Sequence, residues 1–424
     1  MRSNLVQSLL VICCVLGAPQ ASQSVCGDDC VDSCTECCGQ EFLSLHLFDY
    51  LKDEESGVDF DADLTQFFYG VVNGGVEQQG RYTAHGDYVA NLDMQKLSGL
   101  EGLFIKVKAE HRFGQQTDGL TGAIIPSQVL GDLPVRDSED LMLTNLLFMQ
   151  FFSENFGVFF GKMDTFDGDQ NAFASGRGKT QFSNGAFVVA PTGLRTVVYS
   201  TLGAGFVVLV DKEPIFTFTI LNATDTSGTS GFNELFDQGA AIVPELRLPT
   251  NIAGLPGHVL LGGTWSSRQF AALDQSPLIA IPRVPIAQET GSWSLYTNFD
   301  QHLYVNPDDE TQGWGIWGRA GIADNASNPI AWFLSAGIGG NSMINGREQD
   351  TFGVGWYYSS TSRDIAPFLG ALLGGLGDGQ GVECYYSVPV TEWLTVTGDI
   401  QVIDPARRDI DTALFMGMRA VTAF

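Results

Sequence analysis

The chain ends in the sequence ALFMGMRAVTAF, residues 413–424, whose alternate residues are mostly apolar. Counted back by twos from the last residue, one face holds Phe424, Thr422, Ala420, Met418, Met416 and Leu414. A transmembrane barrel strand alternates lipid-facing and lumen-facing residues and carries aromatic side chains where lipid meets water. A soluble β-sandwich can also end on a strand, but it seldom needs an aromatic carboxyl terminus. The pattern therefore predicts the last strand of a membrane barrel.

The amino-terminal sequence predicts export. Arg2 precedes an apolar run from Leu9 to Gly17, and small residues such as Ala18 and Ala21 follow it. This order is typical of a secretory signal peptide, which has a basic start, a short apolar run and small residues before the cleavage site. We place the signal peptide at residues 1–22. A short membrane anchor is the alternative, although a spanning helix needs about 20 apolar residues. Since no later stretch is long and apolar enough either, a membrane location would require a closed barrel.

Composition excludes two broad classes of protein. The 424 residues include 50 glycines and 29 phenylalanines, and only 17% are charged. Disordered chains are poor in aromatic residues and rich in charge, so the composition argues against disorder. The formal net charge of −27 argues against a nucleic-acid partner, because such binding depends on neutralising phosphates with Lys and Arg. The same acidic excess suits an acidic lumen or acidic outer loops.

Five of the eight cysteines lie close together near the amino terminus, at Cys26, Cys30, Cys34, Cys37 and Cys38. In an exported chain this cluster predicts local disulfides. Metal binding is the alternative, but no histidine interleaves the cluster and the spacing matches no zinc pattern. Because five is odd, one thiol is left free, joins another chain or pairs with the distant Cys384.

From Val58 onward the sequence alternates apolar and polar residues, as β-strands do. Asp59, Asp61 and Asp63 would share one face of a strand but would be scattered around a helix. Residues 82–94 and 103–112 repeat the pattern. One wet face also suits a soluble antiparallel sheet. Small residues on the apolar faces and charge along the whole polar faces favour a water-filled membrane barrel instead.

The rest of the chain supplies enough strands for a wide pore. Further strand candidates are residues 141–152, 156–166, 197–210, 214–221, 258–265, 292–299, 313–322, 331–339, 350–358, 381–387 and 394–402. At roughly 20–25 residues per strand the chain holds about sixteen, and bacterial barrels are even-numbered. A barrel of about that size leaves an aqueous channel. The expected fold class is all-β, a transmembrane antiparallel barrel closed between the last strand and the strand of Asp59, Asp61 and Asp63.

A series of short motifs follows in fixed order along residues 42–424. They are LTQFFYGVVNGG (64–75), GDY (86–88), NLD (91–93), AEHRFG (109–114), GKMDTF (161–166), TQFSN (180–184), GRAG (318–321), NGR (345–347), GVG (353–355) and GMR (417–419). Each motif alone is weak, but in this order they resemble the carbohydrate-selective porins of the OprB family. Gly398-Asp399 departs from the family's more usual Pro-Asp, and the cysteine cluster is not a family feature.

The resemblance implies an outer-membrane porin of a bacterium, with about sixteen strands, that admits glucose and other small sugars by passive diffusion. It also implies contact with outer-membrane lipid and a homotrimer. Together with the amino-terminal pattern, the expected organisation is a signal peptide (1–22), a Cys-rich periplasmic segment (23–45) and an OprB-like porin barrel (46–424). No cofactor and no nucleic-acid partner are expected.

Charged residues are the candidate pore lining, because a sugar channel needs polar groups that replace water on hydroxyls and then release them. The candidates are Arg81, His85, Asp87, Lys106, Lys108, Glu110, Arg112, Asp164, Arg177 and Lys179. The segments 82–94 and 103–112 are expected to pair as antiparallel strands. This register places Lys106 and Lys108 near Asp93 and Asn91. It also places Asp87 and His85 at the height of Glu110 and Arg112. Opposite charges would then face each other across strands as a ladder along the sugar path. Alternatively, these charges only pair and solvate the wall.

The Gly- and Asp-rich segment 164–184 is the best candidate for a loop that folds inward and narrows the channel. An external loop is the alternative. The aspartates of this segment lack the spacing of an EF-hand calcium loop, so no metal site is expected. Arg319 and Arg347 lie in family-like motifs, where an arginine can bind sugar or support the fold.

Enzymatic function is not expected. The five histidines are scattered without metal-ligand spacing, and no nucleophile elbow, phosphate loop or zinc-protease motif occurs. The leading hypothesis is a passive sugar-selective porin. The alternatives are a nonselective or cation-preferring porin, which the acidic charge favours, and a structural envelope protein anchored by its barrel.

Overall fold

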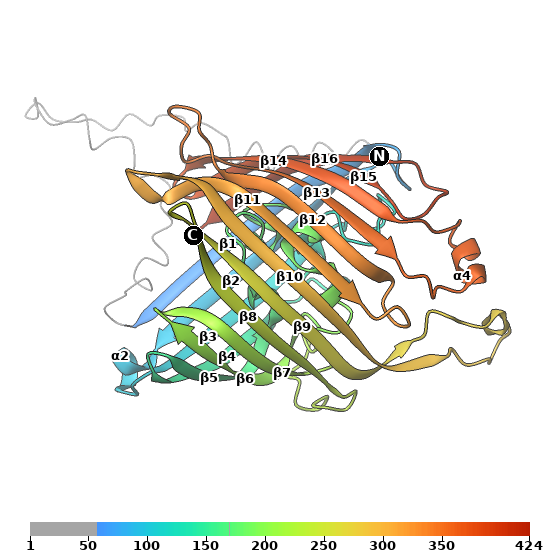
Figure 1. Ribbon diagram of the computed structural model, residues 1–424, viewed down its shortest axis with the longest axis horizontal. Helices are drawn as coiled ribbons and strands as arrows, with labels where there is room; N and C mark the ends of the chain where they lie inside the picture. The colour runs from blue at the N-terminus through green and yellow to red at the C-terminus, as the bar shows by residue number, and fades with distance from the viewer. Residues whose placement is uncertain (1–56, 169) are drawn as a thin grey trace, which may run out of the picture. The chain divides into compact units, whose positions relative to one another are not determined.

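The computed structural model describes residues 57–168 and 170–424, which form a closed antiparallel barrel of sixteen strands (Figure 1). The fold class predicted from the sequence is confirmed. The predicted signal peptide (1–22), the Cys-rich segment (23–45) and the start of the predicted barrel domain (46–56) lie outside the described residues.

The strands are β1 (Val58–Asn73), β2 (Gly80–Asp93), β3 (Leu103–Gly114), β4 (Met142–Ser153), β5 (Phe156–Asp164), β6 (Ser200–Val210), β7 (Glu213–Asn222), β8 (Ala240–Ile252), β9 (Leu255–Ala271), β10 (Gln288–Asn306), β11 (Asp309–Ala323), β12 (Ile330–Asn341), β13 (Thr351–Thr361), β14 (Gly379–Thr391), β15 (Leu394–Asp404) and β16 (Ala413–Ala423). The short helices are α2 (Met94–Ser98), α3 (Gly185–Val188) and α4 (Pro367–Leu372), with 3-10 turns at Leu130–Asp132, Thr165–Gly168, Gly176–Gly178, Pro191–Gly193 and Pro277–Ala280. Within the described part of the chain, no helix is long and apolar enough to cross a membrane.

Strand β1 pairs with β16 and closes the barrel. Asp63 lies opposite Ala423, and Val71 lies opposite Phe415, in antiparallel register. Every other strand pairs with its neighbours in sequence. A closed sheet leaves no edge of unpaired N–H and C=O groups, which lipid could not satisfy. The predicted seam between the last strand and the strand of Asp63 is confirmed.

The two ends of the barrel differ in the length of their connections. Tight turns at residues 154–155, 211–212, 253–254, 307–308 and 392–393 lie at one end. Long connections at residues 115–141, 165–199, 223–239, 272–287 and 362–378 lie at the other. Outer-membrane barrels have short periplasmic turns and long extracellular loops. The long connections of this chain therefore start and end at the extracellular side.

Alternation along each strand separates the lumen from the outer surface. On β1, Phe67 and Tyr69 are buried, whereas the side chains of Phe68 and Val72 are 49% and 53% exposed. Tyr69 packs within the barrel against Phe415 of β16, with 5.3 Å between ring centroids. The odd-numbered residues of β1 therefore face inward, and its even-numbered residues face lipid.

Strand β8 is the one strand that the sequence analysis does not predict. Its Pro244 and Pro249 argue against a strand inside a sheet, because proline has no N–H to donate to the ladder. The structure nevertheless places Pro244 opposite Phe218 of β7 and Pro249 opposite His258 of β9. Pairing on both sides holds the extended backbone despite the two lost donors.

Candidate functional site

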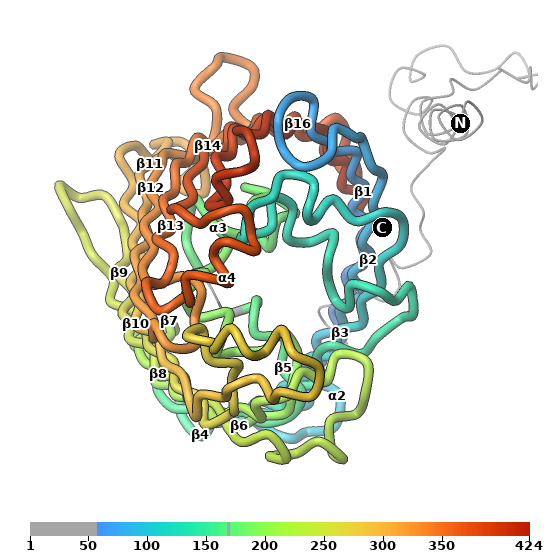
Figure 2. Tube along the Cα trace, turned by 90° about the vertical axis from the view of Figure 1, so that its right-hand side faces the viewer, coloured from blue at the N-terminus to red at the C-terminus, as the bar shows by residue number. Residues whose placement is uncertain are grey.

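The described residues of the connection between β5 and β6, 165–168 and 170–199, lie inside the barrel, and we call them the inner loop. Figure 2 shows its helix α3 within the ring of strands. Glu383 of β14 accepts hydrogen bonds from the backbone N–H groups of Ser183 (2.5 Å) and Asn184 (2.9 Å). The wall thus holds the inner loop by its backbone.

Two arginines of the wall hold the same loop by its carbonyl groups. Arg419 of β16 donates to the carbonyl oxygens of Gly178 (2.8 Å) and Gln181 (2.7 Å). Arg319 of β11 donates to the carbonyl oxygen of Phe187 (2.6 Å). Both arginines are buried. Arg319, which lies in one of the family-like motifs, therefore supports the inner loop.

Aromatic side chains fill the space between the inner loop and the wall. Phe182 and Phe187 of the loop belong to one buried cluster with Trp317 and Tyr385 of the wall. The rings of Phe182 and Trp317 meet edge to face, with 5.3 Å between centroids. Gly355 of β13 leaves room for them, because a Cβ atom there would lie 2.9 Å from Cε1 of Phe187. The inner loop is therefore seated on a hydrophobic core inside the barrel.

A second long loop, residues 115–141, also packs inward. Its Leu130 is buried in a cluster with Phe415 of β16. Arg112 of β3 donates from Nε to the carbonyl oxygen of Gly131 (2.7 Å). Arg112, one of the predicted lining residues, thus holds a loop. The sequence alone did not suggest a role for residues 115–141. The many apolar residues of this segment were nevertheless a usable signal that it is buried.

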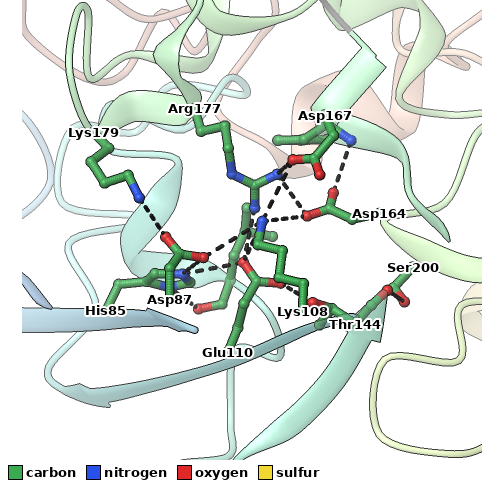
Figure 3. Close-up of polar contacts among 12 residues, drawn as sticks. His85, Asp87, Lys108, Glu110, Thr144, Asp164, Asp167, Arg177, Lys179 and Ser200 are labelled. Atoms are coloured by element: carbon green, nitrogen blue, oxygen red, sulfur yellow. Dashed lines mark hydrogen bonds and ion pairs between the residues drawn. The ribbon is translucent and has the colours of Figure 1, made fainter. Parts of the chain in front are cut away.

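Charged residues of β1, β2, β3, β5 and the inner loop, together with one tyrosine, form one group on the inside of the barrel, which we call the inner cluster (Figure 3). Its members are Asp63, His85, Asp87, Lys106, Lys108, Glu110, Asp164, Asp167, Arg177, Lys179 and Tyr199. The structure therefore brings together all the predicted lining residues except Arg81 and Arg112. Asp63, Asp167 and Tyr199 are the members that the prediction omits.

Arg177 is at the centre of the inner cluster. Its guanidinium lies 2.8 Å from Oε1 of Glu110, 2.6 Å from Oδ2 of Asp164 and 2.7 Å from Oδ1 of Asp167. Lys108 also contacts Asp164, at 2.9 Å. Burial alone would raise the pKa of the Asp167 carboxyl, but Lys108 and Arg177 outweigh burial and lower this pKa to about 2. Asp167 therefore stays ionised at neutral pH.

The predicted ladder of opposite charges across the strands is wrong at its centre. Asp87 of β2 lies directly opposite Glu110 of β3, so like charges face each other. Besides Lys108 of the wall, two balancing cations come from the inner loop. Lys179 Nζ lies 2.8 Å from Asp87, and the Arg177 guanidinium lies 2.8 Å from Glu110. Cross-strand register shows only which wall residues are neighbours, and it cannot include a cation supplied by a distant loop.

Lys106 shows the same effect. It lies opposite Asn91, as the expected register has it. Its ion pair, however, is with Asp167 of the inner loop, at 2.6 Å. The side chain of Asp93 caps α2 by accepting the backbone N–H of Gln95 (3.0 Å). Asp93, at the end of the predicted ladder, therefore caps a helix instead of pairing with a lysine across the strands.

His85 is completely buried between a carbonyl group and two carboxylates. Its Nδ1 lies 3.0 Å from the carbonyl oxygen of Leu133, which can only accept, so Nδ1 carries a proton. Its Nε2 lies 3.5 Å from Asp87 Oδ1 and 3.3 Å from Glu110 Oε1. Two acceptors at Nε2 favour a second proton there. The ring is therefore best described as an imidazolium.

With His85 charged, the inner cluster is electrically balanced. Five carboxylates (Asp63, Asp87, Glu110, Asp164, Asp167) meet five cations (His85, Lys106, Lys108, Arg177, Lys179). Ligand atoms of His85, Asp87 and Glu110 lie within 4.8 Å of one another, a spacing that could hold a metal ion. The Lys108 ammonium lies 3.5 Å from Asp87 Oδ1 and 3.3 Å from Glu110 Oε1. A cation of the chain itself therefore already neutralises these oxygens.

Two other arginines lie outside the inner cluster. Arg81 donates to the carbonyl oxygen of Gln116 (2.5 Å) and to Glu77 (3.1 Å), near the ends of two extracellular connections. Arg347 donates to Asp350 (2.7 Å) in the connection between β12 and β13. Both side chains support the ends of strands.

The inner cluster contributes to the linings of two cavities inside the barrel. The first, about 440 Å³, is lined by Lys179 and by hydroxyl and amide groups that include Thr180, Gln181, Asn341, Thr351, Ser387 and Thr395, and we call it the vestibule. The second, about 530 Å³, is lined by Lys106, Asp164 and Asp167 and by the inner faces of β4 to β8, and we call it the side cavity. The charged groups therefore lie where a solute would meet them in either cavity.

The partly buried carboxyl of Asp132, in the loop 115–141, predicts a pH effect on how firmly that loop is seated. Burial raises the pKa of Asp132 to about 6, which Arg112 offsets only in part. An acid whose pKa is higher in the folded than in the unfolded state stabilises the fold while protonated, fully below about pH 4, and loses this contribution as the pH rises through about 6. We expect single-channel current noise to rise over this interval and Asp132→Asn to abolish the change. The exposed Asp137→Asn is the control, and an unchanged pH response in Asp132→Asn would contradict the assignment.

None of the curated proteins matches the chain in sequence. The family described as "Carbohydrate-selective porin, OprB family" matches residues 77–424. The high-pH structure of Pseudomonas putida OprB gives a TM-score of 0.74 at 20% identity and covers 88% of this chain and 95% of that one. The low-pH structure of the same protein gives 0.55 at 16% identity, with 90% and 98% covered. At these identities the solved structures show a common fold.

Proposed function

The chain belongs to the OprB family of carbohydrate-selective porins of the bacterial outer membrane, and we propose that small neutral sugars cross its lumen past the inner cluster and the inner loop. Passive passage needs no catalyst, only donors and acceptors that replace water on sugar hydroxyls and then release them. Lys106, Asp167 and Lys179 offer such groups, since their side chains are 27%, 23% and 17% exposed.

The observation that carries this proposal is the charge balance of the inner cluster. Every cation of the cluster contacts a carboxylate, so the cluster presents many polar atoms and little net field. A strong field of either sign would enrich ions of the opposite sign in the lumen. A balanced polar wall favours neutral polyols over ions, despite the net charge of −27 for the whole chain.

Proteoliposome swelling tests the proposal. We expect glucose to enter faster than a neutral solute of similar size without ring hydroxyls, and zero-current potentials to show little preference between small cations and anions. Equal rates for all neutral solutes together with a clear cation preference would support a cation-preferring general porin instead. A purified protein that does not conduct would support a structural role. A homotrimer is part of this proposal, and the mass of the detergent-purified protein tests it.

Lys179→Gln is expected to lower the ratio of glucose entry to inorganic cation entry about threefold. The change leaves Asp63 and Asp87 without their shared cation and gives the inner cluster a net negative charge. Swelling rates and zero-current potentials measure the two fluxes. The matched control is Lys212→Gln, which removes the same charge from an exposed turn between β6 and β7. Equal effects of the two variants would contradict a role for the inner cluster.

A further inference from the structure

One side of the lumen is apolar where water should fill it. The side cavity is lined along β4 to β8 by Leu147, Met149, Phe159, Met163, Val207, Leu221 and Val243. Porin interiors are normally polar, because the channel holds water. Apolar surface that stays open to water is characteristic of sites for apolar ligands or partners. We call these residues the apolar strip.

The apolar strip is not simply the support of a buried core. Met163 and Leu221 are buried, but Leu147, Phe159 and Val243 pack against them while remaining half-buried. Their free surface faces a cavity of about 530 Å³. Val197 of the inner loop covers part of the strip, and the surface that remains open offers contact area that the fold itself does not use.

Polar groups line the same cavity as the apolar strip. The hydroxyl group of Tyr296 donates to Glu245 at 2.8 Å, and both residues line the side cavity. Thr219 lines the same cavity. At another part of its lining, Lys106 and Asp167 form their ion pair at 2.6 Å. One cavity thus combines sugar-binding chemistry with an aliphatic surface.

We propose that the porin takes glycosides with an apolar aglycone, such as aryl glucosides, with the aglycone on the apolar strip and the sugar on the polar groups around it. This inference rests on the proposed function, because it needs the sugar to enter the lumen. A free hexose has no group large and apolar enough to cover the strip. An aryl ring is large and apolar enough. Moving it from water onto Leu147, Val207 and Val243 is favourable, because apolar surface of both the ring and the protein is removed from water.

Single-channel recording with added solute measures binding in the lumen as interruptions of the ion current. The probes are phenyl β-glucoside and glucosylglycerol, which carry the same sugar and aglycones of similar size but opposite polarity. We expect phenyl β-glucoside to bind about tenfold more tightly, the scale on which small apolar groups are discriminated by apolar pockets.

Substitutions between valine and threonine, which have the same shape, test whether the apolar strip causes the preference for phenyl β-glucoside. Val207→Thr combined with Val243→Thr adds hydroxyls without changing shape and is expected to remove most of the tenfold preference. Thr219→Val makes the converse change in the same cavity and is expected to increase it. Val421→Thr, the same substitution in the vestibule, is the control and is expected to leave the preference unchanged.

The outcomes separate the two proposals. Equal binding of both glycosides with normal glucose entry overturns the apolar-aglycone inference and leaves the sugar porin intact. Failure of glucose entry in the wild-type protein overturns the proposed function itself. A preference that survives Val207→Thr with Val243→Thr, or that Val421→Thr abolishes, places the aglycone elsewhere and overturns the assignment to the apolar strip.

Discussion

Arg177→Ala is expected to make the lumen prefer cations and to loosen the inner loop. The guanidinium is the common partner of Glu110, Asp164 and Asp167, and two of these carboxylates are fully buried. Without it, four cations remain for five carboxylates in the inner cluster. Removing one partner of a buried ion pair leaves an uncompensated charge and costs about 3–5 kcal/mol. We expect this variant to have the larger effect on selectivity of the two discussed here.

The measurements are the zero-current potential in a salt gradient and the urea dependence of unfolding in detergent. Arg177→Lys keeps the charge but cannot reach three carboxylates with one planar group, so an intermediate result is expected. Arg283→Ala is the matched control, because Arg283 is an exposed loop arginine that also has a positive φ (74°, against 58° for Arg177). An Arg177→Ala channel with wild-type ion selectivity would show that the inner cluster does not lie on the ion path.

Gly355→Leu is expected to increase conductance severalfold by unseating the inner loop. A Cβ atom at this position would lie 2.9 Å from Phe187 and 3.0 Å from Trp317, and the rest of the leucine side chain has no space. Overpacking of a core typically costs about 1–3 kcal/mol. The barrel has its own closed hydrogen-bond ladder, so it should persist while the loop moves away.

Conductance and glucose selectivity should therefore change together in Gly355→Leu, with folding checked by the heat-dependent mobility of the barrel on electrophoresis. The control is Gly398→Leu on β15, where the glycine is exposed and a Cβ atom would meet no atom within 4 Å. It adds the same side chain to the lipid-facing surface and should leave the channel unchanged. Wild-type conductance in a folded Gly355→Leu barrel would mean that the inner loop does not narrow the path.

Alternation in the sequence was enough to predict the barrel and most of the inner cluster. The aspartates of β1 and the charges of β2 and β3 lie on one face of their strands, so period two assigns them to the lumen. Closure of the barrel then predicted that its first and last strands pair. Alternation did not predict β8, because its two prolines are unusual in a strand. The structure keeps this segment extended by pairing it on both sides.

Contacts between distant segments could not be predicted. Glu383 and Ser183 are joined by a hydrogen bond although they are far apart in sequence. The alternation pattern of either segment does not indicate that the two segments meet in space. For this reason neither Glu383 nor Tyr199 was predicted as a site residue. The same limit explains the incorrect ladder, because its missing cations, Arg177 and Lys179, lie on a loop whose path depends on packing against the far wall.

The wall holds the inner loop through the loop's peptide groups. Glu383, Arg419 and Arg319 bind N–H and C=O groups, which every amino acid except proline supplies alike. Substitutions in the loop at Lys179, Thr180 or Gln181 can therefore change the vestibule lining without breaking these anchoring bonds. Related chains could diverge in solute preference while their barrels stay the same, and a library of variants at these three positions would be the direct way to redesign what this porin admits.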